Sequence, residues 1–102
     1  MASYTATKGV TKTLTANTAD TVTLTGTGMR LRIANLDKAT GTGYAIYVGV
    51  ATTGNTPPTA GDNATDCFAI PNSQAIEIPW PGTGAVISVW SANNTEYNAI
   101  LM

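Results

Sequence analysis

The feature that most limits how this chain can fold is a short alternation of apolar and polar residues, interrupted again and again by turn residues. Val22 and Leu24 alternate with threonines, and Leu31 and Ile33 alternate with arginines. A period of two residues gives a strand one buried face, whereas a helix needs a period of 3.6 residues, which no segment shows. Turn residues recur at roughly the 8–12-residue spacing of sandwiches and barrels. The pattern predicts an all-β protein: one β-sandwich or small barrel of about eight short antiparallel strands, jelly-roll or immunoglobulin-like.

Residues 76–90 are predicted to form a central hairpin. Ile76, Ile78 and Trp80 alternate with polar or proline residues, and residues 85–90 are almost continuously apolar. The intervening Pro-Gly-Thr-Gly at 81–84 reads as a turn. Both tryptophans of the chain lie in this stretch, so we expect it to supply much of the buried aromatic surface.

The remaining segments divide into an arm, strands and one long loop. Residues 1–8 are small and polar and are expected to form an N-terminal arm, with residues 9–102 as the sandwich domain. Met29 and Tyr44 are expected to point inward from their strands. The opposite face of the strand that begins at Tyr44 carries mostly small residues, such as Gly49, which predicts that another backbone or subunit approaches it closely. Residues 52–66 form the longest irregular stretch. Residues 96–102 are expected to form a final strand that pairs inside a sheet, with burial at a subunit interface as the alternative.

Composition limits the partners of the chain. A length of 102 residues indicates one domain, and only 11% of residues are charged, against about 25% in average soluble domains. The five cations all lie in the first 38 residues, without the dense basic patch that nucleic acid would need. No run is long and apolar enough to span a membrane, and no signal peptide is expected. The single Cys67 lies in an apolar run and is expected to act as a small buried hydrophobe.

The residue types argue against catalysis. The chain has no histidine, which removes the usual general base and, with one cysteine, the zinc and Cys-His sites. The Gly-Thr-Gly segments at 26–28 and 41–43 lack the third glycine of a dinucleotide loop. We therefore expect no enzyme and no catalytic, cofactor or metal site. Asp62 and Asp66 leave calcium as a weak alternative, because the spaced ligands of a calcium loop are missing.

Two other binding functions remain open from the residues. Trp80, Tyr44, Tyr47 or Tyr97 could stack on sugar rings, although Trp80 and Tyr44 fall on the apolar phase of their strands. Two rows of threonines could form a flat ice-binding array, although threonine is also a good surface residue in strands. These rows are Thr11, Thr13 and Thr15, and Thr21, Thr23 and Thr25.

Several of these segments, taken together, resemble a family of known proteins. They are LTANTADTVTL at 14–24, IANLD at 33–37, the aromatic-rich strand at 44–50, TPPT at 56–59, Ile-Pro at 70–71 and the β-rich end of the chain. In this combination the chain resembles small virion proteins of tailed bacteriophages.

The resemblance implies a capsid decoration or cement protein, often trimeric, without catalytic or cofactor residues. We expect such a protein to be made in the bacterial cytoplasm, to bind the major capsid protein on the outer head surface and to bridge capsid subunits. Residues 1–8 and 52–66 are the predicted contact segments. The alternatives are a tail or fibre protein, with or without glycan binding, and a free carbohydrate-binding module.

Overall fold

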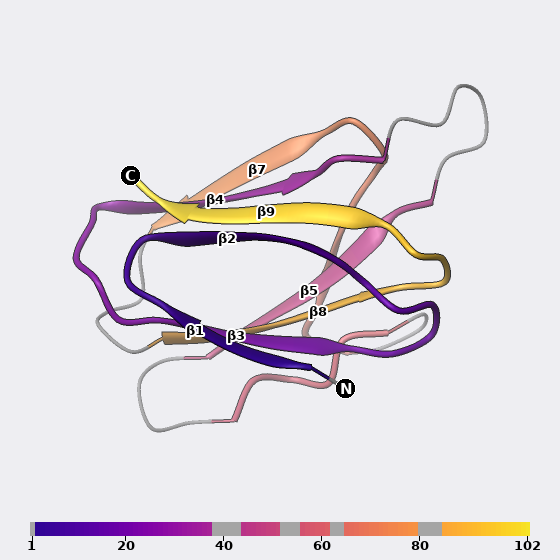
Figure 1. Cartoon of the computed structure of the whole chain (residues 1–102), viewed down its shortest axis with the longest axis horizontal. Helices are drawn as coiled ribbons and strands as arrows, with labels where there is room; N and C mark the ends of the chain where they lie inside the picture. The colour runs from indigo at the N-terminus through magenta and orange to yellow at the C-terminus, as the bar shows by residue number, and fades with distance from the viewer. Residues whose placement is uncertain (1, 38–43, 52–55, 62–64, 80–84) are drawn as a thin grey trace.

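The computed structural model describes residues 2–37, 44–51, 56–61, 65–79 and 85–102, and is all-β in these ranges (Figure 1). The strands are β1 (Ser3–Ala6), β2 (Gly9–Thr13), β3 (Asp20–Leu24), β4 (Arg30–Asn35), β5 (Ile46–Ala51), β6 (Phe68–Ile70), β7 (Ala75–Pro79), β8 (Ala85–Ser91) and β9 (Glu96–Leu101). They form two sheets packed as a sandwich. Sheet A has the order β1-β3-β8-β5-β6, and sheet B the order β2-β9-β4-β7. The predicted all-β sandwich is confirmed.

The strand pairing is that of a jelly roll. Four antiparallel pairs are nested in the chain, with β5 and β6 innermost, then β4 with β7, β3 with β8, and β2 with β9 outermost. This nesting describes one long antiparallel ribbon wrapped around a core, so successive pairs fall alternately in sheet A and sheet B. The jelly-roll member of the two predicted topologies is therefore the one observed, with β1 added beside β3.

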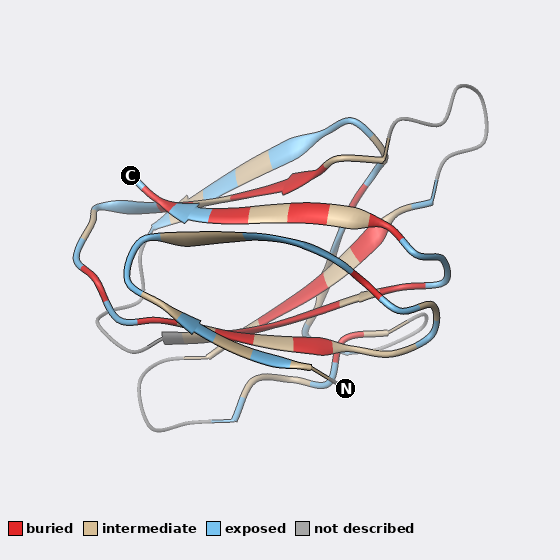
Figure 2. Ribbon diagram, viewed as in Figure 1, coloured by how far each residue is buried: buried red, intermediate tan, exposed pale blue. Residues whose placement is uncertain are grey.

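The core lies between the inner faces of the two sheets, where buried residues alternate with exposed ones along the strands (Figure 2). Val22 and Leu24 from β3 and Leu31 and Ile33 from β4 belong to this core, and all four are at most 1% exposed. Among the described residues, Tyr97 of β9 is the largest fully buried side chain. The alternation predicted for these strands is confirmed, because the pleat fixes which side chains point inward.

The predicted hairpin at 76–90 is wrong. β7 pairs with β4 in sheet B, whereas β8 pairs with β3 and β5 in the middle of sheet A. The two strands therefore lie in opposite sheets, although they are neighbours in the chain. The one-sided pattern of β7 suits an edge strand and that of β8 a central strand, but neither pattern specifies its partner. Trp90 is half-buried on the outer side of sheet A, and Trp80 lies outside the described residues.

The predicted arm also differs from the structure. Ser3–Ala6 forms β1, which pairs in parallel with β3, so this segment is a strand and the sheet is not purely antiparallel. Tyr4 and Ala6 pack against the core, and the backbone N–H of Thr21 donates to the carbonyl of Ala2 at 2.9 Å. Paired backbone and partial burial of two side chains hold the segment against the sandwich.

Two side chains expected in the core lie at the surface. Met29 is 86% exposed and Tyr44 is 47% exposed. The predicted strands include these two residues, but the observed strands begin after them, β4 at Arg30 and β5 at Ile46. The expectation for the end of the chain is confirmed: β9 lies between β2 and β4 inside sheet B.

Candidate functional site

The outer side of sheet A carries no charged side chain among the described residues. We call this surface the uncharged face. It consists of the outward residues of the five strands and the segment packed on them: Ser3, Thr5, Thr21, Thr23, Tyr47, Gly49, Ala51, Ala69, Val86, Ser88, Trp90 and residues 56–61. Its side chains are hydroxyls, small aliphatics and two aromatics. Interface cores are depleted in charge and enriched in tyrosine and tryptophan, and the uncharged face shares these two properties.

Residues 56–61, the described middle of the predicted long loop, are packed onto the uncharged face (Figure 1). The backbone N–H of Ala60 donates to Oγ of Ser88 at 3.3 Å, and both residues are buried. The carbonyl of Pro58 passes so close to Gly49 that a Cβ at this glycine would lie 2.5 Å from it. The predicted close approach of a backbone to the small residues of β5 is therefore observed, and the approaching backbone belongs to the same chain.

Tyr47 and Trp90 form an aromatic pair on the same face. They are register partners on β5 and β8, with ring centroids 5.7 Å apart and planes tilted by 59°. A tilted arrangement at this separation is a favourable aromatic contact. Both rings are half-buried, so each keeps part of its surface accessible.

A groove of about 390 Å³ lies between residues 56–61 and sheet A. Hydroxyl groups line it from both sides, together with small apolar side chains: Ala19, Thr21, Thr56, Pro57, Thr59, Val86 and Ser88. The groove and β1 both belong to the sheet A side. β1 of the predicted contact segment 1–8 and residues 56–61 of the predicted contact segment 52–66 thus lie on one side of the molecule.

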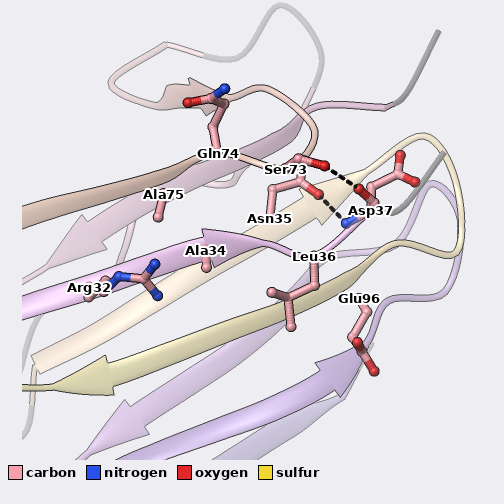
Figure 3. A pocket seen from close by; sticks show the side chains of 9 residues that line it. All are labelled: Arg32, Ala34, Asn35, Leu36, Asp37, Ser73, Gln74, Ala75 and Glu96. Carbon is pink, nitrogen blue, oxygen red and sulfur yellow. Dashed lines mark hydrogen bonds between the residues drawn. The ribbon is translucent and has the colours of Figure 1, made fainter. Parts of the chain in front are cut away.

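The outer side of sheet B has the opposite character. Arg30, Arg32, Glu77 and Glu96 project from it, and we call it the charged face. It holds a more open groove of about 540 Å³, whose floor is the register pair Ala34 and Ala75 (Figure 3). Arg32, Gln74 and Glu96 stand at its rim and point in different directions, so they do not converge on one ligand position.

Hydrogen bonds at the end of this groove serve the fold. The side-chain amide of Asn35 donates to the carbonyls of Tyr44 and Ile70, and its oxygen accepts from the N–H of Asp37. The Ser73 hydroxyl donates to the Asp37 carbonyl at 2.9 Å. Asn35 is 2% exposed with its described donors and acceptors used, so it acts as a structural clamp between β4, β6 and the segment that leads into β5.

The aromatic residues suggested for sugar stacking are separated by the structure. Tyr97 is fully buried and unavailable to a ligand, Tyr44 lies outside the uncharged face, and Trp80 is outside the described residues. Tyr47 is the member of this group that lies on the uncharged face among the described residues, beside Trp90, which the sequence pattern places in the core. The sequence pattern cannot identify the outward side chains of a central strand such as β8, because the strand is apolar on both sides and the pattern does not show which side faces the core.

The threonine rows do not form one array. Thr11 and Thr13 lie on the outer side of sheet B, whereas Thr21 and Thr23 lie on the outer side of sheet A. The two rows therefore face away from each other, which contradicts a flat ice-binding surface built from both.

Of the two aspartates considered for calcium, Asp66 is exposed and Asp62 lies outside the described residues. Among the described residues, no group of three His, Cys, Asp or Glu side chains could hold a metal ion.

Cys67 differs from the expectation of full burial. It is half-buried beside residues 56–61, with Sγ 3.7 Å from the carbonyl of Thr59. Partial burial and the nearby Asp66 carboxylate both raise the pKa of the thiol, which disfavours the reactive thiolate.

In the described part of the chain, no helix has the length and hydropathy of a membrane span.

Comparisons with protein-family models, curated proteins and solved structures find no match for this chain.

Proposed function

We propose that this protein is a structural component of a tailed-phage virion, a capsid decoration protein that docks on the major capsid protein through the uncharged face. The observation that carries the proposal is the division of charge between the two sheets. All charged side chains described on the sheet surfaces project from sheet B, whereas sheet A presents hydroxyls, small residues and the Tyr47–Trp90 pair. A face without charge suits the core of an interface, whereas charged side chains suit contact with solvent.

The position of the predicted contact segments supports the same orientation. β1 and residues 56–61 widen the uncharged face on the side of sheet A, so a partner seated there would meet both. Desolvation of this face costs little, because no described charge has to leave water. Contacts to several capsid subunits at once then raise the effective concentration, and bridging follows without high affinity at any single contact.

The jelly roll is consistent with the proposal only at the level of analogy. Viral capsid domains and lectins both use this architecture, so the fold admits the decoration role and the sugar-binding alternative alike.

The decisive experiment is quantitative mass spectrometry of purified virions. We expect this chain at a copy number on the scale of the major capsid protein. A few copies per particle would place it in the tail or a fibre, and complete absence from the particle would overturn the virion proposal.

A matched pair of substitutions tests which face docks. Ala69 of β6 and Ala75 of β7 are both exposed alanines on edge strands, one on the uncharged face and one on the charged face. Ala69→Lys places an unpaired charge in the proposed interface and should lower occupancy on heads by about tenfold or more. Ala75→Lys should leave it unchanged. Equal occupancy of the two variants, with unchanged melting temperatures, would contradict docking through sheet A.

Carbohydrate binding is a second candidate because of one observation, the half-exposed Tyr47–Trp90 pair beside a hydroxyl-lined groove. Aromatic rings stack on the apolar faces of sugar rings, and hydroxyls supply polar contacts. Under this alternative, Tyr47→Ala should abolish retention on a glycan array while the unfolding midpoint stays within a few degrees. Retention that survives Tyr47→Ala would exclude this pair as a glycan platform.

A further inference from the structure

The sandwich has four edge strands in its described part, and they differ in how well they could accept another strand. β1 and β6 end sheet A, and β2 and β7 end sheet B. β6 has three residues, and β7 carries Glu77 and ends at Pro79, which has no N–H to donate. β2 has five residues, Gly9 to Thr13, without proline and without an acidic residue.

The hydrogen-bond pattern shows which backbone groups of β2 point outward. The N–H of Leu101 donates to the Lys8 carbonyl, and the N–H of Leu14 donates to the Thr95 carbonyl. In an antiparallel pair, alternate residues face the partner. The backbone groups that face β9 therefore belong to Lys8, Val10, Lys12 and Leu14. The N–H and C=O groups of Gly9, Thr11 and Thr13 point away from the sheet.

The same rule shows that β1 offers less. Ala2 and Ala6 accept hydrogen bonds from β3, so only Ser3 and Thr5 point their backbone groups outward from β1. β2 is thus the described edge that can form the longest unbroken ladder with an added strand.

We propose that the occupant of this edge is β2 of a second copy of the chain, paired antiparallel and centred on Thr11. In this register Gly9 of each copy lies opposite Thr13 of the other, Thr11 lies opposite Thr11, and Val10 lies opposite Lys12. No two like charges face each other, and opposed threonines are a favourable cross-strand pair. A register centred on Lys12 would oppose two lysines and is disfavoured.

Two side-chain contacts prepare the edge for this pairing. The amide of Asn98 donates to Oγ1 of Thr11 at 3.0 Å, which orients the threonine and leaves its hydroxyl hydrogen free to donate across the two-fold axis. The ammonium of Lys12 lies 4.6 Å from the centre of the Tyr4 ring, on the side of β1. Lys12 is exposed there, so an added strand would not have to bury its charge.

The symmetry of the pairing has a consequence that rests on the proposed function. Two antiparallel strands of one sheet are related by a two-fold axis perpendicular to that sheet. Both copies therefore keep the same side of the sandwich in the same direction, and both uncharged faces point one way. Such a pair could sit on two neighbouring capsid subunits, which gives the bridging a specific geometry.

The test uses the full chain in solution, without any virion component, so its outcome is independent of capsid docking. Sedimentation velocity and native mass spectrometry should show a wild-type dimer that dissociates on dilution. Thr11→Lys and Thr11→Glu each place like charges at the two-fold axis and should raise the dissociation constant by more than about tenfold. An equimolar mixture of the two variants should restore a dimer, as a heterodimer that weakens with salt.

Glu77→Lys is the matched control, because Glu77 points outward from β7 at the opposite edge of sheet B. It should leave the dimer unchanged. A wild type that is monomeric throughout its soluble range, a trimeric mass, undiminished self-association of Thr11→Lys or failure of the mixture to pair would each overturn the proposal.

Discussion

The hydroxyl of Tyr97 donates a hydrogen bond of 3.0 Å to Oδ2 of Asp20 across the interior of the sandwich. Tyr97 lies on β9 of sheet B and Asp20 begins β3 of sheet A, so the bond joins the two sheets directly. Both side chains are buried, with exposures of 0% and 3%. Burial raises the pKa of the Asp20 carboxyl, and the hydrogen bonds from Tyr97 and the Ala2 backbone offset part of that rise. Burial and the Asp20 charge raise the pKa of Tyr97.

Tyr97→Phe should destabilise the protein more at neutral than at acidic pH. A hydrogen bond to a carboxylate contributes about 1.5–3 kcal/mol and one to a neutral group about 0.5–1.5 kcal/mol. Without the hydroxyl, the pKa of the buried carboxyl rises further, so the stability deficit grows as pH rises from about 4. Urea unfolding at several pH values measures this, and a pH-independent deficit would contradict the assignment.

Asp20→Asn should change the pH profile in the opposite sense. In the wild type the folded-state pKa of Asp20 lies above its unfolded value of about 3.9, so the native state binds more protons and stability falls as pH rises through that interval. An asparagine does not titrate, so its stability relative to the wild type should increase with pH over the same interval. The difference between the two unfolding curves is the quantity to measure, and a flat difference would exclude a raised pKa.

Gly49→Ala should lift residues 56–61 from the uncharged face. The added Cβ would lie 2.5 Å from the Pro58 carbonyl oxygen, which is backbone and has no free rotation away. We expect the free energy of unfolding to fall by about 1–3 kcal/mol, as it does when other well-packed sites are overfilled. Gly61→Ala is the control, because a Cβ there meets nothing within 4 Å. It should be neutral or stabilising by up to about 1 kcal/mol. Equal melting temperatures for both variants would refute the packed position of the segment.

Asn35→Ala should cost at least about 2 kcal/mol of unfolding free energy. It removes the buried bond to the Ile70 carbonyl and the half-buried bonds to the Tyr44 carbonyl and the Asp37 N–H, and an unsatisfied buried group costs about 1–3 kcal/mol. Asn94→Ala is the comparison, since the N–H of Ala16 donates an exposed hydrogen bond to the side-chain oxygen of Asn94. Its cost should stay below about 1 kcal/mol. Chemical denaturation of both variants measures the two losses of unfolding free energy. A larger loss for Asn94→Ala than for Asn35→Ala would contradict the structural role of Asn35.

The sequence predicts the candidate docking surface only in part. The small, polar segment 1–8 and the long, irregular segment 52–66 both draw attention as contact segments, and the structure brings β1 and residues 56–61 to one side of sheet A. The uncharged face itself was missed. Its members come from β1, β3, β5, β6 and β8, which are far apart in the chain, and only the pairing of these strands shows that their outward side chains form one surface.

The chain by itself determined the all-β class, the approximate strands and the inward phase of strands such as β3, β4 and β9, because alternation along a strand follows from the local geometry of the pleat. Only the tertiary structure decided the partners. A strand's backbone groups can pair with any other strand, so the nested jelly-roll order, the separation of β7 from β8 and the parallel addition of β1 depend on contacts between distant segments. For the same reason, alternation could mark Trp90 as apolar but could not show that its side of sheet A faces away from the core.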